Sequence, residues 1–378
     1  MADVKNNIKS KREPLIHIAK RDDMVWWKAW IIRGIAILTS IIIMMAIALV
    51  LANVSRPEYA SVSVIVETMY RGVLGRIEEG SFVMLWKYLQ EVAILLCLAL
   101  ALTPAFKMKF WNCGAEGQAL IGGFGAVVCM IELGGKVPDA LLIPIIIVVS
   151  ILCGAIWGFI PAIFKAFFNT NETLFTLMMN YIATKIIAYY VYIEGGGSHV
   201  IAPQKHGNLP NLLNNDYLLN IVIVALLTVV MFVYLKYSKH GYEINVVGES
   251  QNTARYIGIN VKKVIIRTMC ISGALCGVGG MLLVAGTDHT IRTDSIGGQG
   301  FTAIMISWLG QFNPFIMVIM TGLVKFLEMG MGKVADNCHL NSSFADIVVG
   351  IVLLCVVGCE FFVRYSVKFR RNKKEVKA

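Results

Sequence analysis

Several ionisable side chains interrupt the long apolar stretches of this 378-residue chain. Glu116 lies in a polar, glycine-rich segment, Asn112–Gln118, where a carboxylate could bind a polar solute, carry a proton or make structural hydrogen bonds. Lys185 has no acid near it in the sequence, so it either extends toward the edge of its apolar stretch or meets an acid from another helix. Lys325 and Glu328 are three residues apart, a spacing that lets two side chains on one helix face neutralise each other.

The elements that position these side chains are predicted to be membrane-spanning helices. Hydrophobic residues make up 57% of the chain and charged residues only 15%, whereas soluble domains carry about 25% charged residues. The apolar runs are continuous and of the length that a bilayer core requires, unlike the short alternating strands of a membrane β-barrel. The composition therefore excludes a soluble globular enzyme and predicts an all-α polytopic membrane protein.

About ten apolar runs are predicted to span the membrane. They cover roughly residues 31–53, 91–106, 110–133, 139–165, 172–193, 216–235, 264–287, 300–310, 313–332 and 346–363. The run at 300–310 has only half the length that a bilayer core requires at about 1.5 Å per residue. An even number of spans places both ends of the chain on the same side of the membrane.

The net charge of +10 indicates which side that is. All of it comes from the two ends of the chain, residues 1–33 and 364–378, and the residues between them are neutral as a whole. Basic tails that directly flank apolar spans are typical of the cytoplasmic side, and this explanation is preferred over nucleic-acid binding. The sequence thus predicts cytoplasmic tails at 1–30 and 364–378 around a transmembrane domain at 31–363.

The spacing of the runs predicts an internal duplication. Spans two to five cover roughly 91–193, and spans seven to ten cover roughly 264–363. The second block begins five spans after the first, and an odd offset reverses its orientation, so the two blocks would form an inverted repeat. The polar segment before the third span and the short eighth span are second in their blocks, and such interrupted segments indicate a transport pathway.

The predicted pathway residues come from both blocks. We expect the polar side chains of the third span to face Gln299 and Phe301, while Tyr181 offers an aromatic face that could instead serve packing. Glycine pairs at Gly154-x-x-x-Gly158 and Gly273-x-x-x-Gly277 predict close helix packing. The full set of predicted pathway residues is Asn112, Glu116, Gln118, Asn180, Tyr181, Gln299 and Phe301.

Other chemistry is not indicated by the sequence. The nine cysteines lie mostly in apolar stretches without a CxxC pair, so neither a zinc site nor a disulfide framework is predicted. There is no Gly-x-x-x-x-Gly-Lys-Ser/Thr loop for nucleotide phosphates and no arrangement of a nucleophile with a base. We therefore predict no catalytic residue, no metal and no cofactor.

The longest predicted inner loop covers roughly residues 236–263. It contains a stretch compatible with a short helix, Glu249–Tyr256, followed by Gly258. A short helix ending in glycine suits docking into a groove of a soluble partner, although a solvated loop is the alternative. The residues predicted to make that contact are Glu249, Ala254, Arg255, Tyr256 and Gly258.

Four segments of the chain carry a family resemblance. In order they are Asn112–Gln118 (NCGAEGQ), Asn171–Ala183 (NETLFTLMMNYIA), Asn252–Val261 (NTARYIGINV) and Gly300–Pro314 (GFTAIMISWLGQFNP). They are similar to motifs of the permease subunits of ATP-binding-cassette importers, in the branch for nucleosides and simple sugars. Cys113 stands where that family usually has isoleucine. The resemblance extends over roughly residues 55–365.

This resemblance implies a ten-helix permease with an inverted repeat, which is not itself an enzyme. It implies assembly with ATP-binding subunits that contact the loop around Tyr256, with a second permease subunit as a heterodimer, and with an extracellular solute-binding lipoprotein. The site of action would be the bacterial cytoplasmic membrane, surrounded by lipid and without nucleic acid. The expected solute is a nucleoside or a related ribose or simple sugar. The alternative is a proton-coupled secondary transporter that uses Glu116 or Lys185.

Overall fold

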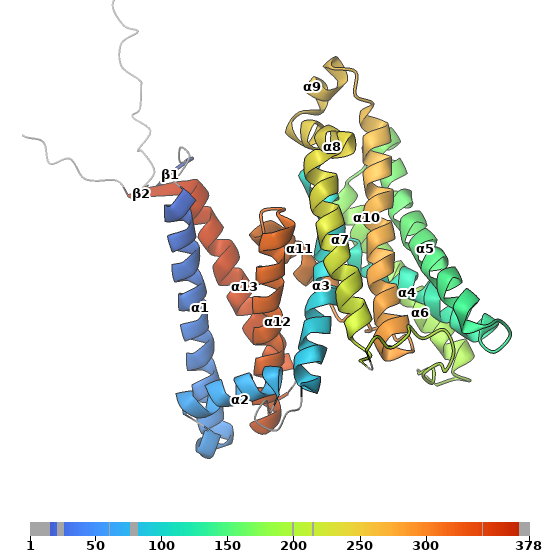
Figure 1. The fold of residues 1–378 in the computed structure, drawn as a ribbon. Helices are drawn as coiled ribbons and strands as arrows, with labels where there is room; N and C mark the ends of the chain where they lie inside the picture. The colour runs from blue at the N-terminus through green and yellow to red at the C-terminus, as the bar shows by residue number, and fades with distance from the viewer. Residues whose placement is uncertain are drawn as a thin grey trace, which may run out of the picture. The chain divides into compact units, whose positions relative to one another are not determined.

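The computed structural model describes residues 16–20, 26–59, 61–75, 82–198, 200–213, 215–341 and 343–369. Almost all of them are helical, which confirms the all-α polytopic class (Figure 1). Within these ranges, eight helices are long and apolar enough to cross a membrane. The predicted short eighth span is a helix of 11 residues. Ten spans and the inverted repeat stay predictions.

The chain divides into two compact units, Ser63–Ala345 and the pair of segments Met1–Val62 and Asp346–Ala378. The larger unit contains almost all the helices. These are α2 (Val62–Leu74), α3 (Val83–Lys107), α4 (Ala115–Leu133), α5 (Asp139–Phe168), α6 (Glu172–Glu194), α7 (Leu218–Tyr237), α8 (Lys239–Glu249), α9 (Gln251–Tyr256), α10 (Val261–Leu283) with the π-helical turn η3 (Val284–Asp288), α11 (Gln299–Leu309) and α12 (Pro314–Asn337).

The smaller unit contains α1 (Trp26–Ser55), the short 3₁₀ turn η1 (Pro57–Tyr59) and most of α13 (Ser343–Arg364). Two short strands, β1 (Ile16–Lys20) and β2 (Tyr365–Phe369), pair antiparallel, with Lys20 opposite Tyr365. The predicted tails at 1–30 and 364–378 otherwise lie largely outside the described residues. The pairing joins the segment before α1 to the segment after α13.

The helices α5 and α10 of the larger unit are in backbone contact through glycines. A Cβ added to Gly158 would lie 3.2 Å from the Cα of Gly273, and one on Gly277 would lie 3.2 Å from the Cα of Gly154. There is no room for side chains at these positions. Because glycine has none, the two helix axes can approach closely. The predicted packing role of the two glycine pairs is confirmed.

The helix α10 has the same kind of contact with α4. A Cβ on Gly280 would overlap the carbonyl oxygen of Ala119 and lie 2.9 Å from the nitrogen of Gly123. A Cβ on Gly122 would overlap the backbone of Gly277. Because α10 has such contacts with both α4 and α5, these three helices form one closely packed group, which we name the glycine block.

The helix α3 packs differently, through side chains, against α11 and α12. Lys325 on α12 is only 1% exposed, and its ammonium lies 3.0 Å from the carboxylate of Glu328 and 3.2 Å from that of Glu91 on α3. The predicted pairing of Lys325 with Glu328 is confirmed. Glu91 is a second partner, and no spacing rule indicated it because it lies 234 residues away.

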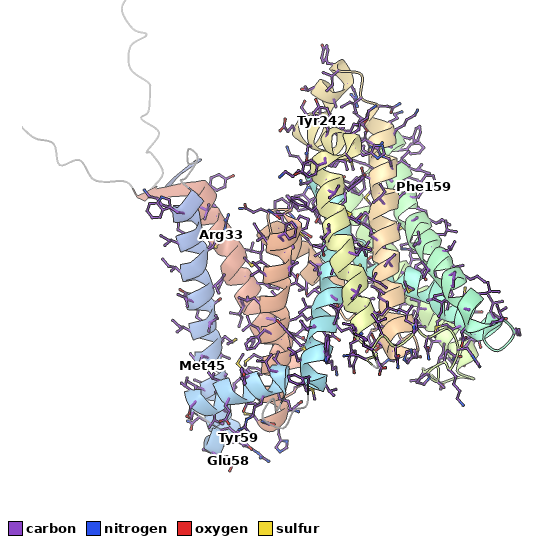
Figure 2. All side chains as sticks on the ribbon, viewed as in Figure 1. Arg33, Met45, Glu58, Tyr59, Phe159 and Tyr242 are labelled. Carbon is purple, nitrogen blue, oxygen red and sulfur yellow. The ribbon has the colours of Figure 1, made fainter. Side chains whose placement is uncertain are left out.

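The helix α10 packs against α5, α4 and α3, and α3 also packs against α7, α11 and α12. The exposed surface of the helices is largely apolar, as lipid requires. Phe159 on the outward side of α5 is one example (Figure 2).

Candidate functional site

Glu116 joins the N-terminal ends of α4 and α11. It lies in the first turn of α4, and its two carboxylate oxygens accept hydrogen bonds from the backbone N–H groups of Gly298 and Gly300, each 2.8 Å long. Gly298 precedes α11 with a φ of 80°, a conformation that glycine adopts readily. A carboxylate at a helix N-terminus satisfies unpaired N–H groups and is stabilised by the helix dipole. The two polar, glycine-rich segments are therefore in direct contact.

The backbones also meet closely at this point, because a Cβ on Gly300 would lie 2.6 Å from the backbone nitrogen of Glu116. The other end of α11 lies near α8, where Gln311 lines a cleft together with Lys107 and Asn245. Eleven helical residues span about 16 Å, roughly half of a bilayer core. The contact at Glu116 is thus about half a bilayer away from the face that carries α8.

Asn112 and Gln118 are buried and bonded mainly to each other. The Asn112 amide nitrogen donates to the Gln118 side-chain oxygen and to the Ser272 hydroxyl on α10, both at 3.2 Å. The Gln118 amide nitrogen donates back to Asn112, also at 3.2 Å. Of the three polar residues expected to face Gln299 and Phe301, the structure places only Glu116 against that segment. No spacing rule indicated Ser272, since its partner Asn112 lies 160 residues away.

Asn180 and Tyr181 point to different sides of α6. The Asn180 amide nitrogen donates to the carbonyl of Cys113 at 2.8 Å, and its oxygen accepts from the N–H of Gly117 at 2.9 Å. Asn180 therefore fixes α6 to the start of α4. Tyr181 is 67% exposed on the outer face of α6, so the two adjacent predicted pathway residues serve different surfaces.

The outer face of α6 also carries Lys185. Tyr181, Lys185 and Tyr189 follow one another at four-residue spacing and line a shallow hollow with Ile182 and Ile186. Among the described residues no carboxylate pairs with the Lys185 ammonium. A lysine at the centre of a membrane helix that faces lipid costs about 3 kcal/mol on insertion scales.

The remaining predicted pathway residues begin α11. Phe301 is 47% exposed, and the side-chain oxygen of Gln299 is buried without a hydrogen-bond partner among the described residues. Trp308, near the end of α11, stacks on Trp111 with ring centroids 5.4 Å apart. Trp308 therefore packs the end of α11, while Phe301 keeps an accessible ring.

The predicted contact loop folds into two helices, α8 and α9, instead of one. Ser250 separates them, because its hydroxyl accepts from the N–H of Thr253 at 3.2 Å and caps α9. Glu249 is thus the last residue of α8, and the prediction of one helix from Glu249 to Tyr256 is wrong. Gly258 follows α9 with a φ of 84°, and its N–H donates to the carbonyl of Arg255 at 3.1 Å, as the predicted stop requires.

The loop residues divide into buried and exposed ones. Ala254 is 0% exposed. It lies in a hydrophobic cluster with Ile244 and Val247 of α8 and with residues at the end of α3 and the start of α10. It holds α9 in place and offers no surface to a partner, which corrects its predicted role. Tyr256 is 92% exposed, and Arg255 and Glu249 are also exposed.

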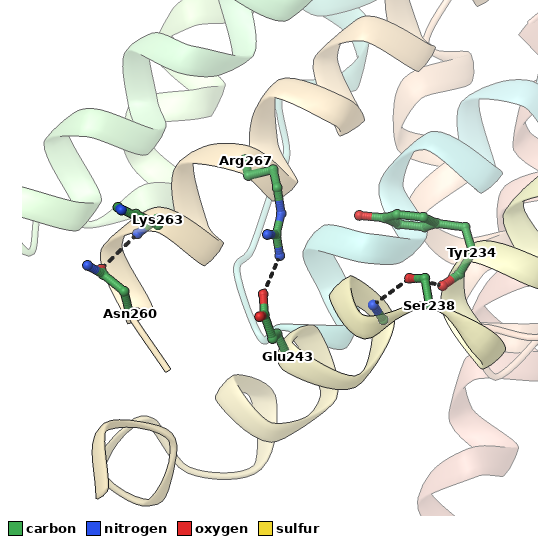
Figure 3. A network of polar contacts seen from close by, with 7 residues as sticks. Tyr234, Ser238, Glu243, Asn260, Lys263 and Arg267 are labelled. Carbon is green, nitrogen blue, oxygen red and sulfur yellow. Dashed lines mark hydrogen bonds and ion pairs between the residues drawn. The ribbon is translucent and has the colours of Figure 1, made fainter. Parts of the chain in front are cut away.

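An ion pair fixes α8 to the start of α10. The Arg267 guanidinium donates to the carboxylate of Glu243 at 2.8 Å, and Ser238 caps α8 by accepting from the N–H of Gly241 (Figure 3). The end of α8 is in backbone contact with α3, because a Cβ on Gly248 would overlap the carbonyl oxygen of Lys107. The loop is thus held to α10 and α3, the first helices of the two predicted blocks.

We expect Arg267→Met to lower the free energy of unfolding by about 1 kcal/mol, since the pair is only partly buried. Thermal unfolding of the purified chain in detergent gives the measurement, in a double-mutant cycle with Glu243→Gln. Lys333→Met is the control, because its ammonium is 3.9 Å from Asp336 in an exposed pair. A coupling energy of zero between Arg267 and Glu243 would contradict the expectation.

Comparisons with known proteins agree with the four motifs. Residues 84–357 match the family described as branched-chain amino acid transport system, permease component. A guanosine ABC transporter permease protein of Bacillus subtilis is 29% identical over 298 residues, which cover 76% of this chain and 84% of the relative. A glucose ABC transporter permease protein of Haloferax volcanii is 26% identical over 290 residues, or 72% and 76%. A nucleoside ABC transporter permease protein of Lactococcus lactis is 25% identical over 305 residues, or 77% and 81%.

The matched residues include the contact between α4 and α11, the loop at α8 and α9, and the glycine block. They extend over well more than half of the chain and over nearly all of the larger unit. The chain therefore belongs to the family of transport-system permease components, and it is a multi-pass membrane protein.

Proposed function

We propose that this chain is the permease subunit of an ATP-binding-cassette importer that moves a nucleoside into a bacterial cell. The observation that carries the proposal is the family match over residues 84–357, together with relatives whose names specify guanosine and nucleosides. A relative named for glucose makes a sugar the competing solute. The proton-coupled alternative is disfavoured, because family membership indicates coupling to an ATP-binding subunit.

The proposed route passes the contact between α4 and α11. Glu116 lies about half a bilayer from the α8 face, and the ring of Phe301 is accessible in the first turn of α11. An aromatic face can stack on a base, and a partly exposed carboxylate can accept from sugar hydroxyls. The start of α4 is fixed to α10 and α6 by hydrogen bonds of Asn112, Gln118 and Asn180, which stabilise this route indirectly.

The proposed partners follow from the family. An ATP-binding subunit contacts α9, a second permease subunit completes the pathway, and a solute-binding lipoprotein delivers the nucleoside. We place α8 and α9 on the cytoplasmic side of the plasma membrane, where Lys107 and Lys236 line the cleft beside Asn245. We also place both tails in the cytoplasm because they are basic, and the pairing of β1 with β2 supports a common side for them.

Uptake of radiolabelled guanosine by cells with and without this chain tests the proposal. We expect uptake to depend on the chain and on the ATP-binding subunit, to persist when the proton gradient is collapsed, and to be inhibited by unlabelled nucleosides. Glucose in excess serves as the competitor control. Inhibition by glucose without inhibition by nucleosides would show that the solute is a sugar. Loss of uptake when only the proton gradient is collapsed would show that ATP is not the energy source.

The exposed tip of α9 gives a separate prediction. We expect Tyr256→Ala to reduce the amount of ATP-binding subunit that co-purifies by about tenfold, because an exposed tyrosine at the centre of an interface commonly contributes more than 1 kcal/mol. Co-purification of the tagged chain from membranes of cells expressing the whole transporter is the measurement. Tyr70→Ala, an exposed tyrosine on α2, is the matched control. Equal recovery with both variants would contradict the placement.

A further inference from the structure

The cleft beside α8 combines two lysines with amide side chains. Its polar lining consists of Lys107 at the end of α3, Lys236 near the end of α7, Asn245 on α8, and Gln311 and Asn313 between α11 and α12. Its volume is about 370 Å³, within the range of about 300 to 1,000 Å³ that is usual for small-molecule sites. Because α3 and α7 end beside the cleft and α12 begins there, it lies at the depth where membrane helices meet the lipid headgroups.

The two lysines have no counter-charge in the part of the chain that the structure describes. There, neither Lys107 nor Lys236 forms an ion pair, and no acidic side chain lines the cleft. Glu243, the carboxylate of α8 nearest in sequence to the cleft residue Asn245, is already paired with Arg267 at 2.8 Å. The cleft therefore presents two uncompensated positive charges.

The rest of the lining is apolar and continues onto the exposed sides of α7 and α12. The ring of Phe232 in the cleft lies 5.0 Å from that of Phe315, centroid to centroid, so the two helices meet there. Val229, one turn deeper along α7, is 51% exposed, and Ile319, one turn beyond Phe315 on α12, is 69% exposed. An acyl chain can lie along these apolar side chains while an anionic group stays at the lysines.

We propose that this cleft binds the headgroup of an anionic phospholipid. The two ammonium groups supply the charge that a phosphodiester needs, and the amides of Asn245 and Gln311 can donate to its oxygens. Basic pockets between membrane helices are typical sites for such headgroups. A zwitterionic lipid would bring its own cation against the lysines, and a free phosphate ion would leave the apolar surface uncovered. The inference does not depend on which solute is transported.

Binding of phosphatidylglycerol to the purified chain in detergent, measured by native mass spectrometry, tests the site. Each basic side chain near an anionic lipid contributes about fivefold to affinity, so Lys107→Gln combined with Lys236→Gln is expected to weaken binding about thirtyfold. The matched control is Lys262→Gln combined with Lys263→Gln, which removes the same charge from exposed side chains at the start of α10, outside the cleft. Equal losses in the two double variants would overturn the inference, because they would indicate general attraction to basic residues.

A single variant keeps the test independent of folding. Lys236 is exposed, so Lys236→Gln is expected to keep the unfolding temperature of the lipid-free chain and to weaken phosphatidylglycerol binding about fivefold. Unchanged binding by this variant and by the double variant in the cleft would refute the site.

Two further probes distinguish a lipid from a free anion. We expect phosphatidylcholine to bind at least about tenfold more weakly than phosphatidylglycerol, because it has no net negative charge. Excess inorganic phosphate at constant ionic strength is expected not to displace phosphatidylglycerol. Equal binding of the two lipids, or displacement by phosphate, would overturn the assignment to an anionic lipid.

Photo-crosslinking identifies what fills the cleft in the assembled transporter. A benzophenone amino acid replaces Gln311, which is exposed in the cleft, and the product formed in cells is identified by mass spectrometry. We expect an anionic phospholipid. A cross-link to another protein chain would show that the cleft is a protein interface and would overturn the inference.

Discussion

Replacing Gly280 by alanine is expected to lower the free energy of unfolding by about 3 kcal/mol. The added Cβ would overlap the carbonyl oxygen of Ala119, which is backbone and has no rotamer to change, so the helices α4 and α10 would have to separate. Thermal unfolding in detergent, followed by the loss of the monodisperse peak in gel filtration, provides the measurement.

Gly332→Ala on α12 is the matched control, because a Cβ there would meet nothing within 4 Å. It is expected to leave stability unchanged or to raise it slightly, since alanine has the higher helix propensity. If the two variants unfolded at the same temperature, backbone contact in the glycine block would not be what stabilises the larger unit.

Glu116→Ala is expected to reduce uptake by roughly a hundredfold. The substitution leaves the N–H groups of Gly298 and Gly300 without their acceptors, and unsatisfied groups of this kind cost about 1 to 3 kcal/mol each. The ends of α4 and α11 then lose the contact that fixes them to each other. Initial rates of guanosine uptake, corrected for the amount of chain in the membrane, test the expectation.

Glu132→Ala is the control for this prediction, because Glu132 is an exposed carboxylate near the other end of α4. Glu116→Gln is informative as a second variant, since one of its two acceptor oxygens becomes a donor and one of the two glycine N–H groups loses its acceptor. Uptake at the normal rate by Glu116→Ala would show that the contact between α4 and α11 is dispensable for transport.

Much of the fold could be predicted from hydropathy because bilayer thickness dictates helix length. The half-length α11 was predicted from its run of ten residues and the glycines before it. The helix α2 lies outside all ten predicted spans. The buried Ile65, Met69 and Val73 recur every four residues and contain the helical signal that could have found it.

The candidate site was predicted less completely, since its partners are far apart in the chain. Glu116 could be singled out as a charged residue among glycines. Its partners could not, because they are backbone N–H groups, which do not depend on a specific residue type. Ala254 illustrates the opposite problem. A small residue in a polar loop gives no sign of whether it faces solvent or a core, and only the fold shows that it is buried.

Helices that touch through their backbones do not slide along each other, because the carbonyl and Cα ridges interlock and no side chain can rearrange to let them pass. The glycine block of α4, α5 and α10 is therefore expected to keep its internal geometry. Any rearrangement is then expected between this block and its neighbours, not within it. Glu116 belongs to the block, whereas the N–H groups of Gly298 and Gly300 that donate to its carboxylate belong to the start of α11. A movement of α11 relative to the block would therefore have to break both hydrogen bonds.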